Sequence, residues 1–286
     1  MFSRAVVATD LGAASEAIVG CAGSLGSLGV REVFLVYAID LEREPSAEQD
    51  AAFSRQAESL ESAGITVHVE TPLGYAPHAI ASLAEERNAQ LIIMGTHGMG
   101  LFHTGFSGSV SSDVIRMSTV PVLLTPSSAM GTAEEGGKAC ARLLGSVLVP
   151  IDVTMSTEPI CNIVCGLAPL GFGRFELLHV VPMDFETVRE SREDRARDVL
   201  DGIAARARIA GVNEISVTVV RGEPEKLVPA YAASGRYTLL ILAPGCHDTI
   251  DQAFGSVTNA VIRQAATPML LAPPGCDIIP YRRGNT

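Results

Sequence analysis

The stretch LIIMGTHGMGLFHTGFSGSVSSDVI, residues 91–115, joins a short apolar run to a glycine-rich loop and then to the start of a helical pattern. Its first four residues, Leu91–Met94, are apolar without alternation, which is typical of a strand covered on both faces. Three of the five glycines in the loop, Gly95, Gly98 and Gly108, define its key spacing. Ser109 is expected to open the helix. This order favours an open α/β sheet, whose ligands bind beyond the carboxyl ends of the strands.

The same alternation of short apolar runs and longer amphipathic stretches extends over the first half of the chain. The runs predict strands at Ala5–Thr9, Val33–Ala38, Ile65–Val69, Leu91–Met94 and Val120–Leu124. The amphipathic stretches predict helices at Ser15–Leu28, Ala47–Ala63, Ala76–Asn88 and Ser109–Met117. Strands that alternate regularly with helices indicate a doubly wound parallel sheet.

An internal repeat places a second copy of this pattern in the other half of the chain. AVVATD (5–10) recurs as VLVPID (147–152), LIIMGT (91–96) as LLILAP (239–244), and STVPVLLTP (118–126) as AATPMLLAP (265–273). We therefore predict two domains of one α/β fold, at residues 1–127 and 144–274, with a polar linker at 128–143 and a tail at 275–286.

The charge of the chain limits its partners. With 21 Lys and Arg against 32 Asp and Glu, the net charge is −11, which argues against electrostatic capture of nucleic acid or of an anionic membrane. The apolar runs are shorter than the ~20 residues of a membrane span, and no basic segment marks a signal peptide. We expect a cytoplasmic protein that holds any phosphate ligand by local backbone geometry.

The loop from Gly95 to Ser109 could supply that geometry. Glycines allow the backbone to approach a ligand closely. A helix that begins at Ser109 presents free N–H groups and the positive end of its dipole, which together bind anions without a lysine. On spacing alone, the alternative is a flexible glycine loop capped by a serine.

Gly95-x2-Gly98-x9-Gly108-Ser109, followed by VPVLLT, resembles the ATP-binding signature of the universal stress protein family. The similarity extends to the opening strand, which ends in Asp10, and to GYAPHAI at 74–80, and it covers nearly all of both halves. The chain is thus identified as a tandem member. The resemblance implies five-stranded sheets of order 3-2-1-4-5, of the adenine nucleotide alpha hydrolase-like class. It also implies ATP or AMP as ligand, with Mg or Mn held through the phosphates, and a role in the stress response.

The resemblance also implies which residues bind the nucleotide. It assigns the adenosine to Ala8, Thr9 and Asp10, the adenine to Tyr37 and Ala38, the ribose to Met94 and Gly95, and the phosphates to His97, Gly98, Gly108, Ser109, Val110 and Ser111. Two simpler roles stay open. Asp10 could cap the first helix, which does not exclude a ribose contact, and His97 could be an ordinary loop residue.

The second copy departs from this signature. Aligned by strands, it has Cys246 opposite Gly98 and a shorter spacer before Gly255; aligned by glycines, it has Asp248 there. A side chain, or a carboxylate, would then occupy space meant for phosphate. The run Gly255–Thr258 still preserves the helix start. We predict a second domain that is mainly structural or binds nucleotide weakly.

Two other functional classes compete with a regulatory nucleotide-binding protein. An enzyme that hydrolyses ATP or transfers its phosphoryl or adenylyl group is disfavoured, because no general base, arginine finger or Walker-type acid lies near the motif and the first copy has no lysine. A nucleotide-free interaction module is disfavoured by the intact motif of the first copy. The resemblance implies pairing of the two domains within the chain, Val120–Leu124 beside Met269–Ala272, and a homodimer.

Two cysteine clusters give weaker signals. Cys161 and Cys165 share one helix face, but no histidine or acid joins them at ligand spacing, which favours buried apolar packing over a metal site. Cys246, His247 and Asp248 resemble a nucleophile cluster, yet the members of a catalytic triad are normally distant in the chain.

Overall fold

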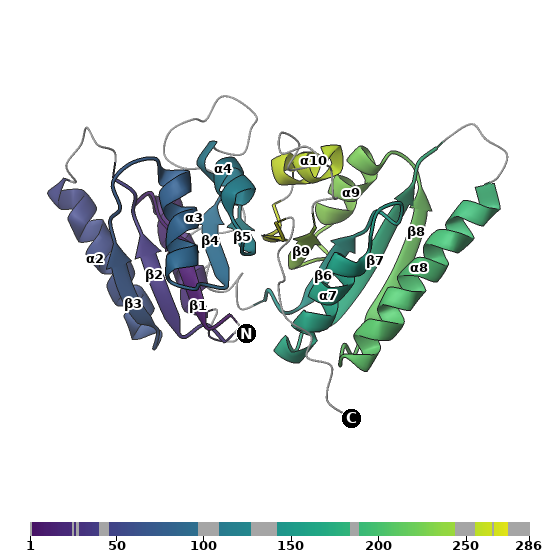
Figure 1. Ribbon diagram of the computed structural model, residues 1–286, viewed down its shortest axis with the longest axis horizontal. Coiled ribbons are helices and arrows are strands. Elements are labelled where there is room, and N and C mark those ends of the chain that lie inside the picture. The colour runs from purple at the N-terminus through teal and green to yellow at the C-terminus, as the bar shows by residue number, and fades with distance from the viewer. Residues whose placement is uncertain are drawn as a thin grey trace. The chain divides into compact units, whose positions relative to one another are not determined.

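The chain folds into two compact units, each of which combines a β-sheet with helices (Figure 1). One unit comprises Met1–Arg142 and Pro268–Cys276, and the other comprises Leu143–Thr267 and Asp277–Thr286. The structure is a computed structural model that describes residues 2–24, 26, 29–39, 46–96, 109–126, 142–183, 189–243, 255–264 and 266–273. Within these ranges, no helix has the length and hydrophobicity to cross a membrane.

The sheet of the first unit has the strand order β3-β2-β1-β4-β5-β10. Its strands are β1 (Arg4–Ala8), β2 (Glu32–Val36), β3 (Thr66–Glu70), β4 (Leu91–Gly95), β5 (Val122–Thr125) and β10 (Met269–Leu271). The first five strands are parallel, and their order confirms the predicted 3-2-1-4-5 arrangement. β10 pairs antiparallel with β5, with Leu270 opposite Leu123.

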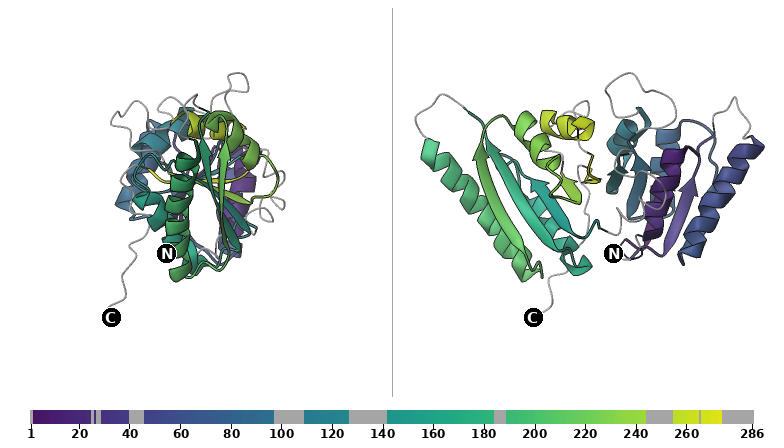
Figure 2. Two further views of the ribbon diagram at one scale, coloured as in Figure 1. Left: turned by 90° about the vertical axis from the view of Figure 1, so that its right-hand side faces the viewer. Right: turned by 180° about the vertical axis from the view of Figure 1, so that it is seen from behind.

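Helices cover both faces of this sheet. They are α1 (Ala13–Ser24), α2 (Ala47–Ser62), α3 (Ala76–Glu86) and α4 (Ser109–Met117). α1 packs against α2, and α3 packs against α4. In Figure 1 α3 lies in front of the sheet, whereas α1, in purple, lies in front in the rear view of Figure 2. Burial on both faces explains why the central strands are apolar without alternation.

A capping box marks the start of α2. The Ser46 hydroxyl accepts the Gln49 backbone N–H at 3.3 Å, and the Gln49 side-chain oxygen accepts the Ser46 N–H at 2.9 Å. These bonds satisfy donors that the helix itself leaves free. The predicted start at Ala47 is therefore correct.

The sheet of the second unit has the order β9-β6-β7-β8, and its paired strands are all parallel. Its strands are β6 (Ser146–Pro150), β7 (Arg174–Val181), β8 (Ile215–Arg221) and β9 (Leu239–Leu242). Its helical segments are α7 (Glu158–Leu167), the short η2 (Ala168–Leu170), α8 (Arg189–Ile209), α9 (Pro224–Ala232) and α10 (Ser256–Gln264). α7 packs on α8, and α9 packs on α10, as α1 packs on α2 and α3 on α4. The repeated order confirms that one α/β fold occurs twice.

Observed strand ends differ from the predicted ones by one or two residues. β1 begins at Arg4 and β2 at Glu32, one residue before the apolar runs. These two polar residues lie opposite each other in the sheet, and Arg4 Nε donates to Glu32 Oε2 at 2.8 Å. An ion pair thus extends both strands, and a hydrophobic pattern does not detect it.

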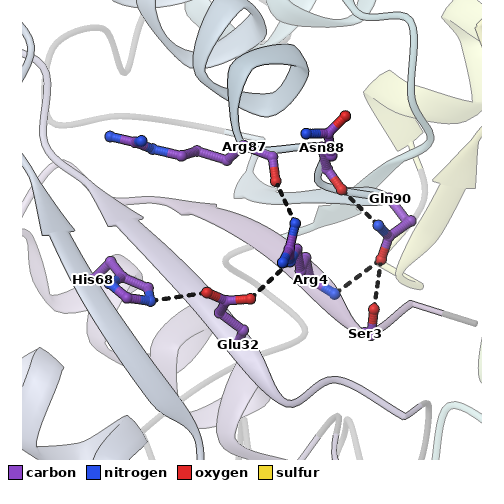
Figure 3. A network of polar contacts seen from close by, with 7 residues as sticks. All are labelled: Ser3, Arg4, Glu32, His68, Arg87, Asn88 and Gln90. Carbon is purple, nitrogen blue, oxygen red and sulfur yellow. Dashed lines mark hydrogen bonds and ion pairs between the residues drawn. The ribbon is translucent and has the colours of Figure 1, made fainter.

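Figure 3 shows that this pair belongs to a polar network at the amino ends of the strands. Glu32 Oε1 lies 2.9 Å from His68 Nε2, and Arg4 Nη1 donates to the Arg87 carbonyl at 3.3 Å. The Gln90 side-chain oxygen accepts the Arg4 backbone N–H at 2.9 Å and the Ser3 hydroxyl at 3.1 Å. The network therefore connects β1, β2 and β3 to the segment between α3 and β4.

We expect Glu32→Gln to lower the free energy of unfolding by about 0.5–1 kcal/mol, because these ion pairs are partly exposed to solvent. Denaturant titration of the full chain measures this change. Arg55→Gln is the matched control, because Arg55 Nη2 lies 3.8 Å from Glu16 Oε1 and this pair is more exposed than the pair of Arg4 with Glu32. A loss above about 2 kcal/mol would contradict a surface role for the network.

Candidate functional site

The carboxyl ends of β1, β2 and β4 lie at one edge of the first sheet. β1 pairs with β2 on one side and with β4 on the other, so the strand order reverses at β1. Ala8 at the end of β1 lies opposite Val36, and Val7 lies opposite Ile93. The residues that follow these strands therefore gather at a topological switch point, the usual place for ligands in such sheets.

A tight turn after β1 is held by Asp10. Its Oδ1 accepts the Gly12 backbone N–H at 3.0 Å and the Ser15 hydroxyl, and Ser15 Oγ accepts the Asp10 N–H at 3.1 Å. Leu11 N donates to Thr9 Oγ1 at 2.9 Å and has a φ of 62°. The left-handed conformation costs a leucine about 1–2 kcal/mol. Strain of this kind concentrates at functional sites.

Asp10 thus stabilises the turn that leads into α1, a role similar to the helix capping that its position allows. Its side chain is half-buried. The turn also fixes the backbone of Thr9, whose N–H donates to the Val36 carbonyl at 2.9 Å. This hydrogen bond joins the residues that follow β1 to the end of β2.

Tyr37 and Ala38 follow β2 and are half-buried. The Tyr37 hydroxyl accepts a hydrogen bond from Gln49 Nε2 at 2.9 Å, and its ring lies 6.2 Å from the Phe53 ring in a tilted arrangement. Gln49 is also the capping-box residue of α2. The start of α2 therefore holds the tyrosine at the edge of the sheet.

The end of β4 and the start of α4 meet at the same edge. Met94 is buried, and its carbonyl accepts the Thr125 hydroxyl at 3.1 Å. Ser111 in the first turn of α4 is also buried, and its Oγ lies 3.5 Å from the Thr96 carbonyl. These contacts fix the first turn of α4 beside the residues that follow β4.

The predicted site residues fall into two groups. The structure describes Ala8, Thr9, Asp10, Tyr37, Ala38, Met94, Gly95, Val110 and Ser111, and the strands and helix that carry them converge on the carboxyl edge. Ser109 begins α4, as predicted. His97, Gly98 and Gly108 lie outside the described residues.

One contact near this edge was not predicted. Tyr75, which precedes α3, donates a hydrogen bond from its hydroxyl to Asp113 Oδ2 of α4. That bond is the main cause of a raised pKa for Tyr75. Asp113 also lies 3.6 Å from Arg116 Nη1. Tyr75 therefore ties the start of α3 to α4 and helps to position the helix that begins at Ser109.

The second unit keeps the turn but changes the helix start. Asp152 Oδ1 accepts the Thr154 backbone N–H at 2.9 Å, as Asp10 accepts that of Gly12. Ser256, the first residue of α10, donates to Glu225 Oε1 at 2.7 Å. This bond is the main cause of a lowered pKa for Glu225. A carboxylate of the protein thus lies at the helix start.

The difference can be read from the two sequences once the contact is known. With Gly74 of GYAPHAI aligned to Gly222 of GEPEKLV, Pro77 stands opposite Glu225. The glycine spacing of the loop does not predict the contact between Ser256 and Glu225, because Glu225 lies in a different helix, α9. The aligned loop residues Cys246 and Asp248 lie outside the described part of the second unit.

A sequence profile described as the universal stress protein family matches residues 1–126 and 170–273. The chain belongs to the universal stress protein family. The two matched segments fall in the two repeats, which makes the chain a tandem member.

Two curated relatives match parts of this universal stress protein. Universal stress protein Sll1654 of Synechocystis sp. is 40% identical over 76 residues, which is 27% of this chain and 44% of the relative. Universal stress protein Slr1230 of the same organism is 36% identical over 64 residues, 22% of each chain. The chain therefore spans less than half the length of these relatives.

Solved structures share the tandem fold. A universal stress protein from Archaeoglobus fulgidus DSM 4304 superposes with a TM-score of 0.67 at 21% identity, covering 94% of this chain and 96% of the other. The functionally unknown protein PA1789 from Pseudomonas aeruginosa PAO1 gives 0.68 at 15% identity, covering 97% and 94%. At these identities the similarity is one of fold.

The described residues contain no group of three or more His, Cys, Asp or Glu placed to hold a metal ion.

Proposed function

We propose that this universal stress protein is a regulatory protein that binds one adenine nucleotide, ATP or AMP, at the carboxyl edge of the first sheet. The observation that carries the proposal is the convergence of the Asp10 turn, the end of β2 and the start of α4 at the point where strand order reverses. The adenosine would lie against Thr9, Asp10 and Ala38, with the phosphates toward Ser109.

The proposal also accounts for phosphate binding by an acidic chain. The net charge of −11 disfavours nonspecific capture of polyanions such as nucleic acid, and of anionic membranes. The backbone N–H groups and the positive end of the helix dipole at the start of α4 would attract an anion locally. Mg or Mn bound to the phosphates would lower the remaining charge.

For the second domain, we propose a structural role with weak nucleotide binding or none. Glu225 supports this, because its carboxylate already accepts the Ser256 hydroxyl at the start of α10. A phosphate placed there would lie close to a carboxylate, and like charges at short range repel. The turn at Asp152 would still accommodate an uncharged nucleoside.

We also propose two domains, at residues 1–127 and 144–274, with a linker at 128–143 and a tail at 275–286. The proposal includes a cytoplasmic location. It also includes pairing of the two domains within the chain and a homodimer. The antiparallel pair of β5 with β10 supports the placement of Met269–Ala272 beside Val120–Leu124. Size-exclusion chromatography with light scattering tests the dimer, since a monomer at all concentrations would contradict it.

Calorimetric titration of the full chain with AMP and with ATP, each with and without Mg, tests the proposed binding. We expect one site per chain, with Mg strengthening the binding of ATP more than that of AMP because ATP carries more phosphate charge. The absence of binding for both nucleotides would contradict the proposal.

Glu225→Gln should strengthen phosphate binding by the second unit about tenfold, because it removes the negative charge and keeps a similar shape. The expected result in the same titration is a second, weaker ATP site. Glu223→Gln is the matched control, because Glu223 precedes α9 and its Oε2 lies 2.6 Å from Lys226 Nζ. An ATP titration identical to that of the wild type would contradict the role assigned to Glu225.

A further inference from the structure

The second unit contains a buried pair of thiols in α7. Cys161 and Cys165 are one helical turn apart, and their Sγ atoms lie 3.9 Å from each other. Their relative exposures are 1% and 7%. Side chains at positions i and i+4 lie on one face of a helix, and here the two sulfurs are in contact. The spacing predicts the shared face, whereas the contact of the sulfurs is a finding of the structure.

A charged pair lies beside these thiols. Arg206 of α8 donates from Nη1 and Nη2 to the two carboxylate oxygens of Glu158, at 2.7 and 2.8 Å. Arg206 Nη2 also lies 3.5 Å from the Asn162 side-chain oxygen. The guanidinium is close enough to favour the thiolate form of Cys161, and Glu158 opposes it. The Arg206 guanidinium thus lies near the sulfurs and is already paired with Glu158.

The Cys161 thiol is a poor nucleophile in the free protein. Burial, followed by the neighbouring Cys165, raises the pKa of Cys161 to about 12. A protonated and buried thiol reacts slowly, because the thiolate is the nucleophile. Binding of a thiophilic metal ion can still displace both protons, since metal–thiolate bonds are strong.

The number of ligands decides which metal suits the pair. Structural zinc needs four ligands, and within the described residues no third His, Cys, Asp or Glu joins the two sulfurs in a metal-binding group. Thiolates select soft ions such as Cu(I), which can bind two sulfurs alone. Even at the zinc–sulfur bond length of about 2.3 Å, two collinear bonds would span only about 4.6 Å. The sulfurs would need to separate by less than 1 Å from the observed 3.9 Å.

We propose that Cys161 and Cys165 form a two-coordinate thiolate site for a soft monovalent metal ion, with Cu(I) as the physiological ligand. Binding forms two Cu–S bonds, releases the two thiol protons to solvent and involves no change of oxidation state. The resulting bis-thiolate complex carries one negative charge, which the Arg206 guanidinium stabilises. The site lies in the second unit and is independent of the proposed nucleotide site.

The test uses the full chain with Cys21, Cys140, Cys246 and Cys276 replaced by serine, so that only the α7 pair remains. Cu(I) is titrated without oxygen against a chromophoric Cu(I) chelator. We expect one Cu(I) per chain and an X-ray absorption spectrum with two sulfur neighbours. No transfer of Cu(I) from the chelator, or a shell of three or more sulfurs, would overturn the proposal.

Variants in the same background separate metal binding from folding. Cys161→Ala and Cys165→Ala should each weaken Cu(I) binding at least about 100-fold, and circular dichroism verifies that they fold, because a buried cysteine behaves as a small apolar residue. Arg206→Gln keeps both sulfurs and should weaken binding about tenfold by removing the adjacent charge. Undiminished binding by Cys165→Ala would overturn the paired site.

Discussion

Replacing Gly98 by aspartate is expected to abolish nucleotide binding by the full chain, with a loss of at least about 100-fold in affinity, or about 2.7 kcal/mol. Gly98 is the second glycine of the motif that leads from β4 to the start of α4. A carboxylate at this position would lie against the phosphates and repel them, and its Cβ would take up space that the backbone needs to approach the ligand. Calorimetric titration with ATP measures the effect.

Two further variants divide this loss into its causes. Gly98→Ala adds the Cβ without charge and should retain more affinity than Gly98→Asp. Gly245→Asp places the same carboxylate in the corresponding loop of the second repeat and should leave ATP binding unchanged. Wild-type affinity in Gly98→Asp would show that the motif is not the binding site.

Asp10→Ala is expected to reduce nucleotide affinity at least about tenfold and to lower the free energy of unfolding by about 1–3 kcal/mol. The carboxylate accepts the Gly12 N–H and the Ser15 hydroxyl, and the turn that it holds contains Leu11 in the left-handed conformation. Its loss removes the two hydrogen bonds that the carboxylate makes in the turn and any bond to the ribose. Titration with AMP and denaturant unfolding measure the two effects.

Ser15→Ala is the matched control for Asp10. It removes the hydroxyl that bonds to the Asp10 carboxylate and to the Asp10 N–H, but it leaves the carboxylate in place. If Asp10 contacts the ribose, Asp10→Ala should weaken AMP binding at least about fivefold more than Ser15→Ala does. Equal losses of AMP affinity in the two variants would show that Asp10 supports the turn and does not contact the ribose.

Sequence patterns predict much of this fold because they report local geometry. The apolar runs locate the strands of the first unit, and their alternation with helices predicts the parallel sheet. Strand ends are less predictable, since Arg4 and Glu32 extend their strands through an ion pair across 28 residues. The contact depends on the register of the sheet, which no pattern within either strand encodes.

The sequence did not predict the contacts between helices at the starts of α4 and α10. Tyr75 reaches Asp113 across 38 residues, and Ser256 reaches Glu225 across 31. Each pair joins two helices that pack together only in the folded chain. The glycine spacing predicts where α4 begins, but it does not reveal the carboxylate at the corresponding start of α10.

The last strand shows a similar limit. The repeat places Met269–Leu271 in the second copy, whereas the structure pairs β10 with β5 and groups it with the first unit. Repetition in sequence identifies which strands correspond. The pairing of β10 with β5 forms only in the folded chain, and repetition in the sequence does not encode it.

Nucleotide binding can be tested by denaturing the purified full chain and by identifying and counting the released nucleotides with chromatography and mass spectrometry. We expect about one adenine nucleotide per chain, ATP, ADP or AMP, from the wild type, and none from Gly98→Asp. Two nucleotides per chain would contradict the role assigned to the second unit. A wild-type protein that releases none and binds none on titration would contradict nucleotide binding by the first unit.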